Sequence, residues 1–306
     1  MMKSTPIEWT DRTWNPIAGC SPVSPGCANC YASRFAHRFS GPGRAFEGLV
    51  TPTGKWTGSI ATRIGSLVAP LAWRGHHRVF VNSMSDLFHK RVEEWVVAAM
   101  IGVIGACKSH TFQVLTKRPE NAAKTFAALI GRSNGRYLAP ACAEHAASTL
   151  KKLAASGRSE EHEVCVSFGI ADRLLLAANR AAGVDVPTNL ELLASCESQR
   201  YWDERVDALL GCPGNVKGVS LEPLLEPIVL TPSRLMRLQW VIVGCESGPG
   251  RRPCEVRWIE QIVKQCRASN VPVFVKQVAI GNRVSKRPED WPESIRVRMY
   301  AGQRWE

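Results

Sequence analysis

The chain has 306 residues, 45% of them hydrophobic, and a formal net charge of +12, with 24 glycines and 19 prolines spread along its length. No apolar run approaches the roughly 18 residues that cross a membrane, and residues 1–14 are too polar for a secretory leader. The 11 cysteines are an odd number and mostly lie in apolar stretches. This usage excludes a disulfide framework and predicts a reduced, cytoplasmic protein.

The charge is concentrated at the two ends of the chain. Residues 1–90 and residues 251–306 each carry a net charge of +6, whereas residues 91–250 are neutral. If the two ends lie side by side, they form one basic face that attracts a polyanion such as nucleic acid or a nucleotide. A basic surface without such a ligand is the competing interpretation.

Three cysteines lie close together near the N-terminus. Cys20, Cys27 and Cys30 follow a predicted extended segment at residues 6–10, in a loop rich in glycine and proline. Four thiolates would close a zinc or iron-sulfur site, but three leave one coordination position free. The loop therefore predicts a metal centre that can bind a further ligand.

Short apolar segments rich in β-branched and aromatic residues alternate with segments of helical periodicity. The predicted strands are residues 78–82, 111–116, 189–194, 216–221, 239–244 and 271–276. The predicted helices are residues 57–73, 90–108, 119–130, 199–210 and 255–269. This alternation predicts an α/β fold with a parallel sheet and right-handed crossovers, either open or closed into a barrel.

Two segments depart from the alternation. Residues 131–187 are rich in alanine and predict a helical insertion, for which a lid is one role. Residues 281–306 contain several arginines and aromatic residues and predict a basic C-terminal flap.

Polar residues follow each predicted strand, where a parallel sheet places its ligand sites. The polar residues and glycines at these strand ends are Asn82, Ser83, Asp86, Lys117, Arg118, Glu197, Glu222, Gly244, Glu246, Ser247, Gly248 and Lys276. We expect them to gather with the cysteine loop on one rim of the sheet.

One tripeptide occurs twice on this rim. Cys-Glu-Ser appears at residues 196–198 and again at residues 245–247. Glu197 and Glu246 are candidates to hold hydroxyls or an amino group of a cofactor. The alternative is a coincidence between two strand ends that each need a small buried residue and an acid at a helix start.

Six motifs in order resemble one known family. They are the run at residues 7–16, the cysteine cluster with Tyr31 and Ala32, and residues 80–88, 115–119, 220–225 and 240–250. Together they resemble the phage-associated three-cysteine-motif proteins, which are similar to radical S-adenosylmethionine (SAM) enzymes and distantly to spore photoproduct lyase.

The resemblance implies a partial (β/α) barrel of the radical SAM type, formed by one domain over residues 1–306. It also implies a 4Fe-4S cluster on Cys20, Cys27 and Cys30 and an enzyme that cleaves SAM to a 5'-deoxyadenosyl radical. A separate partner protein is implied as well. The usual cysteine spacing is three residues and then two, whereas here the first gap has six residues and the aromatic Tyr31 follows the third cysteine.

On this resemblance, residues of the rim divide into two groups. The candidates for binding the cofactor are Asn82, Ser83, Asp86, Glu197, Glu222, Gly244, Glu246, Ser247 and Gly248. Lys117, Arg118 and Lys276 are candidates to receive a phosphate or carboxylate of the substrate, and ion pairs with neighbouring glutamates are the alternative for each.

Other classes of protein also fit the cysteines. With His37 they could form a Cys3His zinc site in a nucleic-acid-binding protein. An iron-sulfur protein without catalytic activity is a further alternative, and three cysteines without a metal are another.

Overall fold

The computed structural model describes residues 5–156 and 161–305. Residues 157–160 of the predicted insertion and Glu306 of the predicted flap lie outside the described residues. The centre of the fold is an eight-stranded sheet with the order β1-β4-β5-β6-β7-β8-β9-β10. Its strands are β1 (Arg12–Trp14), β4 (Arg78–Val81), β5 (Thr111–Thr116), β6 (Leu190–Ser195), β7 (Val216–Leu221), β8 (Trp240–Gly244), β9 (Val273–Ile280) and β10 (Arg283–Ser285).

The sheet is parallel from β1 to β9, and only β10 runs antiparallel, as the second strand of a hairpin with β9. Among the described strands, β1 and β10 are the two free edges, so the sheet curves but is not closed into a barrel. The α/β alternation predicted from the sequence is therefore confirmed at the level of a mostly parallel sheet.

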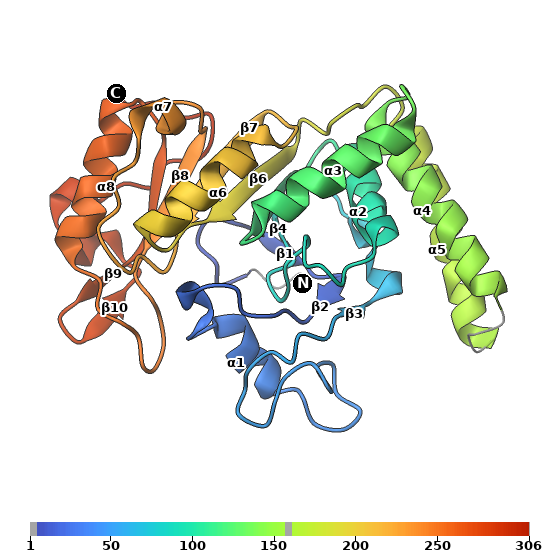
Figure 1. Cartoon of the computed structure of the whole chain (residues 1–306), viewed down its shortest axis with the longest axis horizontal. Coiled ribbons are helices and arrows are strands. Elements are labelled where there is room, and N and C mark those ends of the chain that lie inside the picture. Colours follow the sequence, from blue (N-terminus) through green and yellow to red (C-terminus); the bar gives the residue numbers. More distant parts are fainter. Residues whose placement is uncertain (1–4, 157–160, 306) are drawn as a thin grey trace.

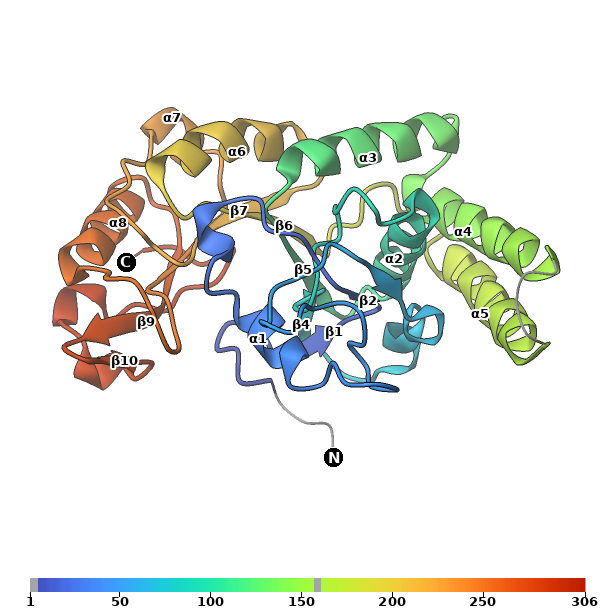
Figure 2. The same cartoon turned by 60° about the horizontal axis from the view of Figure 1, so that its bottom comes forward.

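Helices cover the convex face of this sheet, as the outer arc in Figure 2 shows. They include α2 (Glu94–Ala106), α3 (Pro119–Ser133), α6 (Gln199–Gly211) and α8 (Val256–Ala268), with a short α7 (Pro232–Leu235). Strand residues such as Val79, Val114 and Val241 alternate outward into the large core under these helices. The alternate positions face the concave side, where the N-terminal segment lies.

The segment between α3 and β6 contains a helical hairpin, α4 (Leu138–Ala155) and α5 (Glu161–Arg180). The hairpin packs on α2, at the right of Figure 1, and lies away from α1 (Tyr31–His37). Gly102 of α2 permits this packing, because a Cβ there would lie 2.5 Å from the Cβ of Ala143. Because the hairpin packs on α2 and away from the strand ends, its position does not favour the role of a lid over them.

Aromatic residues fill the concave face at the amino ends of the strands. Trp9, Phe80, Trp240 and Phe274 form a buried cluster, and Tyr300 stacks on Trp240 with ring centroids 5.9 Å apart. The Tyr300 hydroxyl also donates to the carbonyl of Glu8 at 3.4 Å. The N-terminal and C-terminal segments of the chain therefore meet here.

Two predicted elements of the N-terminal region are wrong. Residues 6–10 form a turn rather than a strand, with Thr10 N donating to the carbonyl of Ile7, and Trp9 enters the aromatic cluster instead. Residues 57–73 do not form one helix, because Gly58, Gly65 and Pro70 interrupt the periodicity. They form β3 (Ala61–Thr62), which pairs with β2 (Ile17–Ala18), and two short 3-10 helices.

No helix in the described ranges is both long enough and apolar enough to span a membrane.

Candidate metal centre at the rim of the sheet

Three short elements position the cysteines. Cys20 follows β2, Cys27 ends the 3-10 helix Pro25–Cys27, and Cys30 immediately precedes α1. Gly19 lets the start of the cysteine loop pack closely against Ser59. Its φ is +96°, and a Cβ there would lie 2.1 Å from the carbonyl oxygen of Ser59. All three thiols are partly buried and free of disulfides.

A buried ion pair holds the first cysteine. The Arg118 guanidinium lies 2.7 Å from the Asp86 carboxylate and donates to the carbonyl of Ser21 at 2.7 Å and to Cys20 Sγ at 3.7 Å. Asp86 also accepts from the Thr116 hydroxyl at 2.7 Å. Burial raises the pKa of the Cys20 thiol to about 11, although Arg118 acts in the opposite direction. A metal ion at Cys20 would have to displace the thiol proton.

His89 supports the same end of the loop. Its Nδ1 accepts from the backbone N–H of Arg91 at 3.2 Å, so its Nε2 carries the proton and donates to the Ser21 hydroxyl at 2.8 Å. Burial, with a contribution from Arg118, lowers the pKa of His89 to about 4. His89 is therefore neutral at pH 7 and acts as a fixed donor.

Glu197 anchors the middle of the loop. Its fully buried carboxylate accepts from the backbone N–H of Gly26 at 3.3 Å and lies 3.0 Å from both Lys117 Nζ and Arg205 Nη1. Burial alone would raise the pKa of Glu197, but Lys117 and Arg205 outweigh it and hold the pKa at about 2. The carboxylate is thus ionised at the point where it contacts the residue before Cys27.

Glu246 anchors the loop between the second and third cysteines. Its carboxylate accepts from Asn29 Nδ2 at 3.0 Å and from Arg252 Nε at 3.0 Å. Arg252 also donates to the carbonyl of Pro25 at 2.8 Å. Although burial opposes ionisation, these hydrogen bonds hold the pKa of Glu246 below its usual value.

The repeated tripeptide therefore has a common structural role. Its two glutamates bind the cysteine loop on either side of Cys27, and both carboxylates already have cationic partners. Cys196 and Cys245 pack into the core behind them, and burial raises the pKa of each thiol to about 12. These two cysteines are packing residues.

A row of polar groups lies on the concave side beneath the loop. Lys117 Nζ donates to the Ser195 hydroxyl at 2.7 Å, and that hydroxyl donates to the carbonyl of Glu222 at 3.3 Å. The Glu222 carboxylate accepts from the Ser220 hydroxyl at 3.3 Å and pairs with Lys276 Nζ at 3.0 Å. Gly244 leaves room for this carboxylate, because a Cβ there would lie 2.8 Å from Glu222 Oε1.

Of the remaining predicted rim residues, some lie near the cysteine loop and one faces the core. Asn82 has φ +58° and directs its amide nitrogen to Met100 Sδ of α2, 4.0 Å away, so it faces the core. Ser83 lies on the rim, where its hydroxyl donates to Asn15 Oδ1 at 3.1 Å. Ser247 and Gly248 form a loop that receives Arg34 of α1, whose guanidinium donates to the carbonyl of Ser247 at 3.0 Å.

Several residues of the site were missed by sequence reasoning. Asn29, Arg34, His89, Arg205 and Arg252 all support the cysteine loop or its partners. Only Asn29 carried a sequence signal, since it stands directly before Cys30.

The three cysteines suit some metal groups better than others. In the described ranges, no three or more His, Cys, Asp or Glu side chains form a group suited to one metal ion. His37 lies at the end of α1 beside Gly54 and is exposed. In a 4Fe-4S cluster each thiolate binds a different iron, so three thiols presented by one loop suit a cluster in their chemistry.

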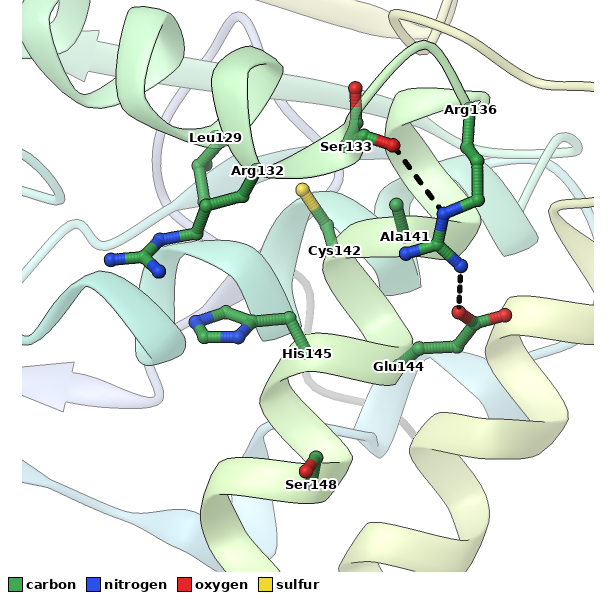
Figure 3. Close-up of a pocket in the computed structure, with 9 residues that line it drawn as sticks. All are labelled: Leu129, Arg132, Ser133, Arg136, Ala141, Cys142, Glu144, His145 and Ser148. Atoms are coloured by element: carbon green, nitrogen blue, oxygen red, sulfur yellow. Dashed lines mark hydrogen bonds and ion pairs between the residues drawn. The ribbon is translucent and has the colours of Figure 1, made fainter.

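A cavity of about 500 Å³ lies between α3 and α4 (Figure 3). Its basic residues are already paired, since Arg136 lies 2.6 Å from Glu144 and Arg132 pairs with Glu94. Burial raises the pKa of the Cys142 thiol to about 12, which makes it a poor nucleophile. This cavity lacks the set of buried charged groups that hold the cysteine loop in place.

The fold and the rim define a class of α/β protein in which a three-cysteine loop is fixed over the carboxyl ends of a parallel sheet. Residues 4–306 match a family described as "Protein of unknown function (DUF5131)", and the chain belongs to that family. No curated protein and no solved structure matches the chain.

Proposed function

We propose that this protein is a radical SAM-like iron-sulfur enzyme with a 4Fe-4S cluster on Cys20, Cys27 and Cys30. The observation that carries the proposal is the support of the loop. Asp86 with Arg118, Glu197 and Glu246 hold it at three successive points over the polar rim. Buried charged groups that hold a ligand-bearing loop in this way keep the metal ligands at fixed positions.

The sheet supports the same proposal. Its parallel strands direct their carboxyl ends toward the loop, which is where α/β proteins bind ligands. The concave side beneath the loop carries Lys117, Ser195, Glu222 and Lys276. This agrees with the partial barrel that the resemblance implies.

The protein's own groups would divide the work. The three thiolates would hold the cluster, which, once reduced by an external electron donor and with SAM bound, would supply one electron for cleaving the sulfonium carbon-sulfur bond. Glu222 offers oxygen acceptors for hydroxyl or amino groups. Lys276 and Lys117 each already pair with a rim glutamate, as the alternative for these lysines required, and both stay partly exposed to offer a cation for a carboxylate. Three carboxylates act as positioning groups in this proposal. Glu197 and Glu246 bind the cysteine loop directly, and Asp86 binds Arg118, which in turn contacts the loop.

The aromatic cluster at the opposite end of the concave face helps to exclude water from the polar row. Trp9, Trp240, Phe274 and Tyr300 close that end, so access to the polar row is from the rim. Exclusion of water protects a reactive intermediate from side reactions.

Anaerobic reconstitution with iron and sulfide tests the proposal. We expect a brown protein that binds SAM and releases 5'-deoxyadenosine once reduced. A colourless protein with one zinc per chain would instead indicate the Cys3His alternative. A coloured protein that never cleaves SAM would indicate a cluster used for electron transfer or structure.

A further inference from the structure

We propose that α1 and the loop after it bind single-stranded nucleic acid by stacking unpaired bases on aromatic side chains. We call this surface, formed by Tyr31, Phe35, Phe39, Arg38 and Arg44, the α1 face. The inference deepens the proposed function by naming single-stranded nucleic acid as its substrate class. It rests on that function for the claim that the bound strand is a substrate.

Three exposed aromatic rings define the α1 face. Tyr31, Phe35 and Phe39 are 50%, 48% and 43% exposed and recur at every fourth position. The rings of Phe35 and Phe39 lie 5.1 Å apart, and Phe35 is supported edge-on by the ring of Phe46. Large apolar groups clustered on a surface usually mark a binding site, since exposing them to water is unfavourable.

The segment that carries these rings is rich in cations without acidic partners. Residues 31–63 contain five basic residues and one acid, Glu47, whose carboxylate accepts from the backbone N–H of Gly43. In the part of the chain that the structure describes, none of the five has a carboxylate within 4.0 Å, unlike Arg118, Arg234 or Arg252. The five are Arg34, Arg38, Arg44, Lys55 and Arg63. The segment thus carries uncompensated positive charge, which complements a phosphate backbone.

The α1 face adjoins the candidate metal centre. Cys30 directly precedes Tyr31, whose hydroxyl donates to the carbonyl of Ser83 beyond β4 at 2.9 Å. Arg34, one turn further on, binds the loop after β8. Figure 2 shows α1 on the inner side of the helical arc. A base stacked on Tyr31 would therefore lie beside the loop that holds the three cysteines.

The combination of rings and cations favours a single strand over other polyanions. Aromatic side chains stack only on bases that are not already paired and stacked in a duplex. A duplex or an acidic protein would engage the cations but would gain little from flat, exposed rings. The α1 face has both features in one short segment.

The test is binding of the full-length protein to fluorescently labelled 20-nucleotide strands of oligothymidylate and oligouridylate, with a DNA duplex of equal length for comparison. We expect the single strands to bind more tightly than the duplex, with affinity that falls as salt is added. The two single strands distinguish DNA from RNA as the source of the bases.

Variants separate stacking from charge. Phe35→Ala should weaken single-strand binding about 5- to 100-fold, and Phe35→Leu should do nearly the same while keeping an apolar contact with Phe46. Arg38→Ala should lower the salt slope by roughly one unit. Phe168→Ala on α5 and Lys152→Ala on α4 are matched controls at exposed positions away from the α1 face, and both should bind as the wild type does.

Three results would overturn the inference: no binding of oligonucleotides at low salt, equal binding of duplex and single strand, or full affinity in both Phe35 variants. The iron content of the same samples is measured in parallel. Protein that loads iron but shows no preference for single strands contradicts the inference alone. Protein that binds single strands but takes up no iron contradicts the proposed function alone.

Discussion

Asn29 Nδ2 donates to Glu246 Oε2 at 3.0 Å, which joins the cysteine loop to the end of β8 across 217 residues of sequence. The same carboxylate oxygen accepts from the backbone N–H of Arg252 at 2.9 Å, so Glu246 is held in place from its own side. This contact fixes Asn29, one of the two residues between Cys27 and Cys30, and it makes the end of β8 part of the framework that holds the cysteine loop.

Removing the Asn29 amide should loosen the cluster. Asn29→Leu keeps the size of the side chain but cannot donate to Glu246. Loss of a hydrogen bond that positions a metal ligand typically costs about 10- to 100-fold in metal affinity. We expect the reconstituted variant to lose iron to a chelator at least about tenfold faster than the wild type. Ser247→Ala is the control, because Arg34 of α1 binds the carbonyl of Ser247 rather than its hydroxyl. Equal rates of iron loss in Asn29→Leu and wild type would contradict this role.

Glu197 should make stability depend on pH in the acid range. Its folded pKa of about 2 lies below the ordinary value of 4.5, so its stabilising contribution is complete above pH 4.5 and is lost as pH falls toward 2. The full contribution is on the order of 3 kcal/mol. The difference in unfolding free energy between wild type and Glu197→Gln should therefore shrink as the pH is lowered from 5 to 2. A difference that stays constant over this range would show that the carboxylate is not held ionised by Lys117 and Arg205.

The Arg118–Asp86 pair predicts a large loss of stability when only one partner is removed. Both side chains are nearly inaccessible to solvent, and Arg118→Met leaves the Asp86 carboxylate buried without its cation. We expect a loss of about 3–5 kcal/mol in urea-induced unfolding. The double variant Arg118→Met with Asp86→Asn should recover part of this loss, since no unpaired charge remains. Additive losses in the double variant would mean that the two groups act independently.

Gly248 and Gly250 separate the effect of a contact from that of backbone strain. Both have positive φ, but a Cβ at Gly248 would lie 2.7 Å from Arg34 Nη2, whereas nothing lies within 4 Å of one at Gly250. Gly248→Ala should therefore release Arg34 and increase hydrogen exchange in α1, while Gly250→Ala should change stability without this local effect. Similar exchange in α1 for both variants would rule out a specific contact.

The sequence was most informative where periodicity alone decides the structure. β5 and β7 have the predicted bounds, because short apolar runs between helical segments are typical of buried parallel strands. The N-terminal region was less predictable. Trp9 reads as part of a strand, but its large ring is buried more favourably against Phe80 and Trp240, which come from distant strands.

The role of the rim glutamates could not be read from the sequence. Their position after strands correctly placed Glu197 and Glu246 near the cysteine loop, but the partners of Glu197 include Gly26, 171 residues earlier. A carboxylate at a strand end has the same sequence signal whether it binds a ligand or positions a loop. Only the positions of Lys117, Arg205, Asn29 and Arg252 around these carboxylates separate the two roles.

The central claim, a 4Fe-4S cluster on the cysteine loop, is tested most directly by iron and acid-labile sulfide in the anaerobically reconstituted protein. Cys30→Ala is compared with the wild type, and Cys254→Ala at a buried position is the control. We predict about four irons per chain in wild type and Cys254→Ala, and almost none firmly bound in Cys30→Ala. Full iron content in Cys30→Ala, or a wild-type protein that binds one zinc and no iron, would contradict the account.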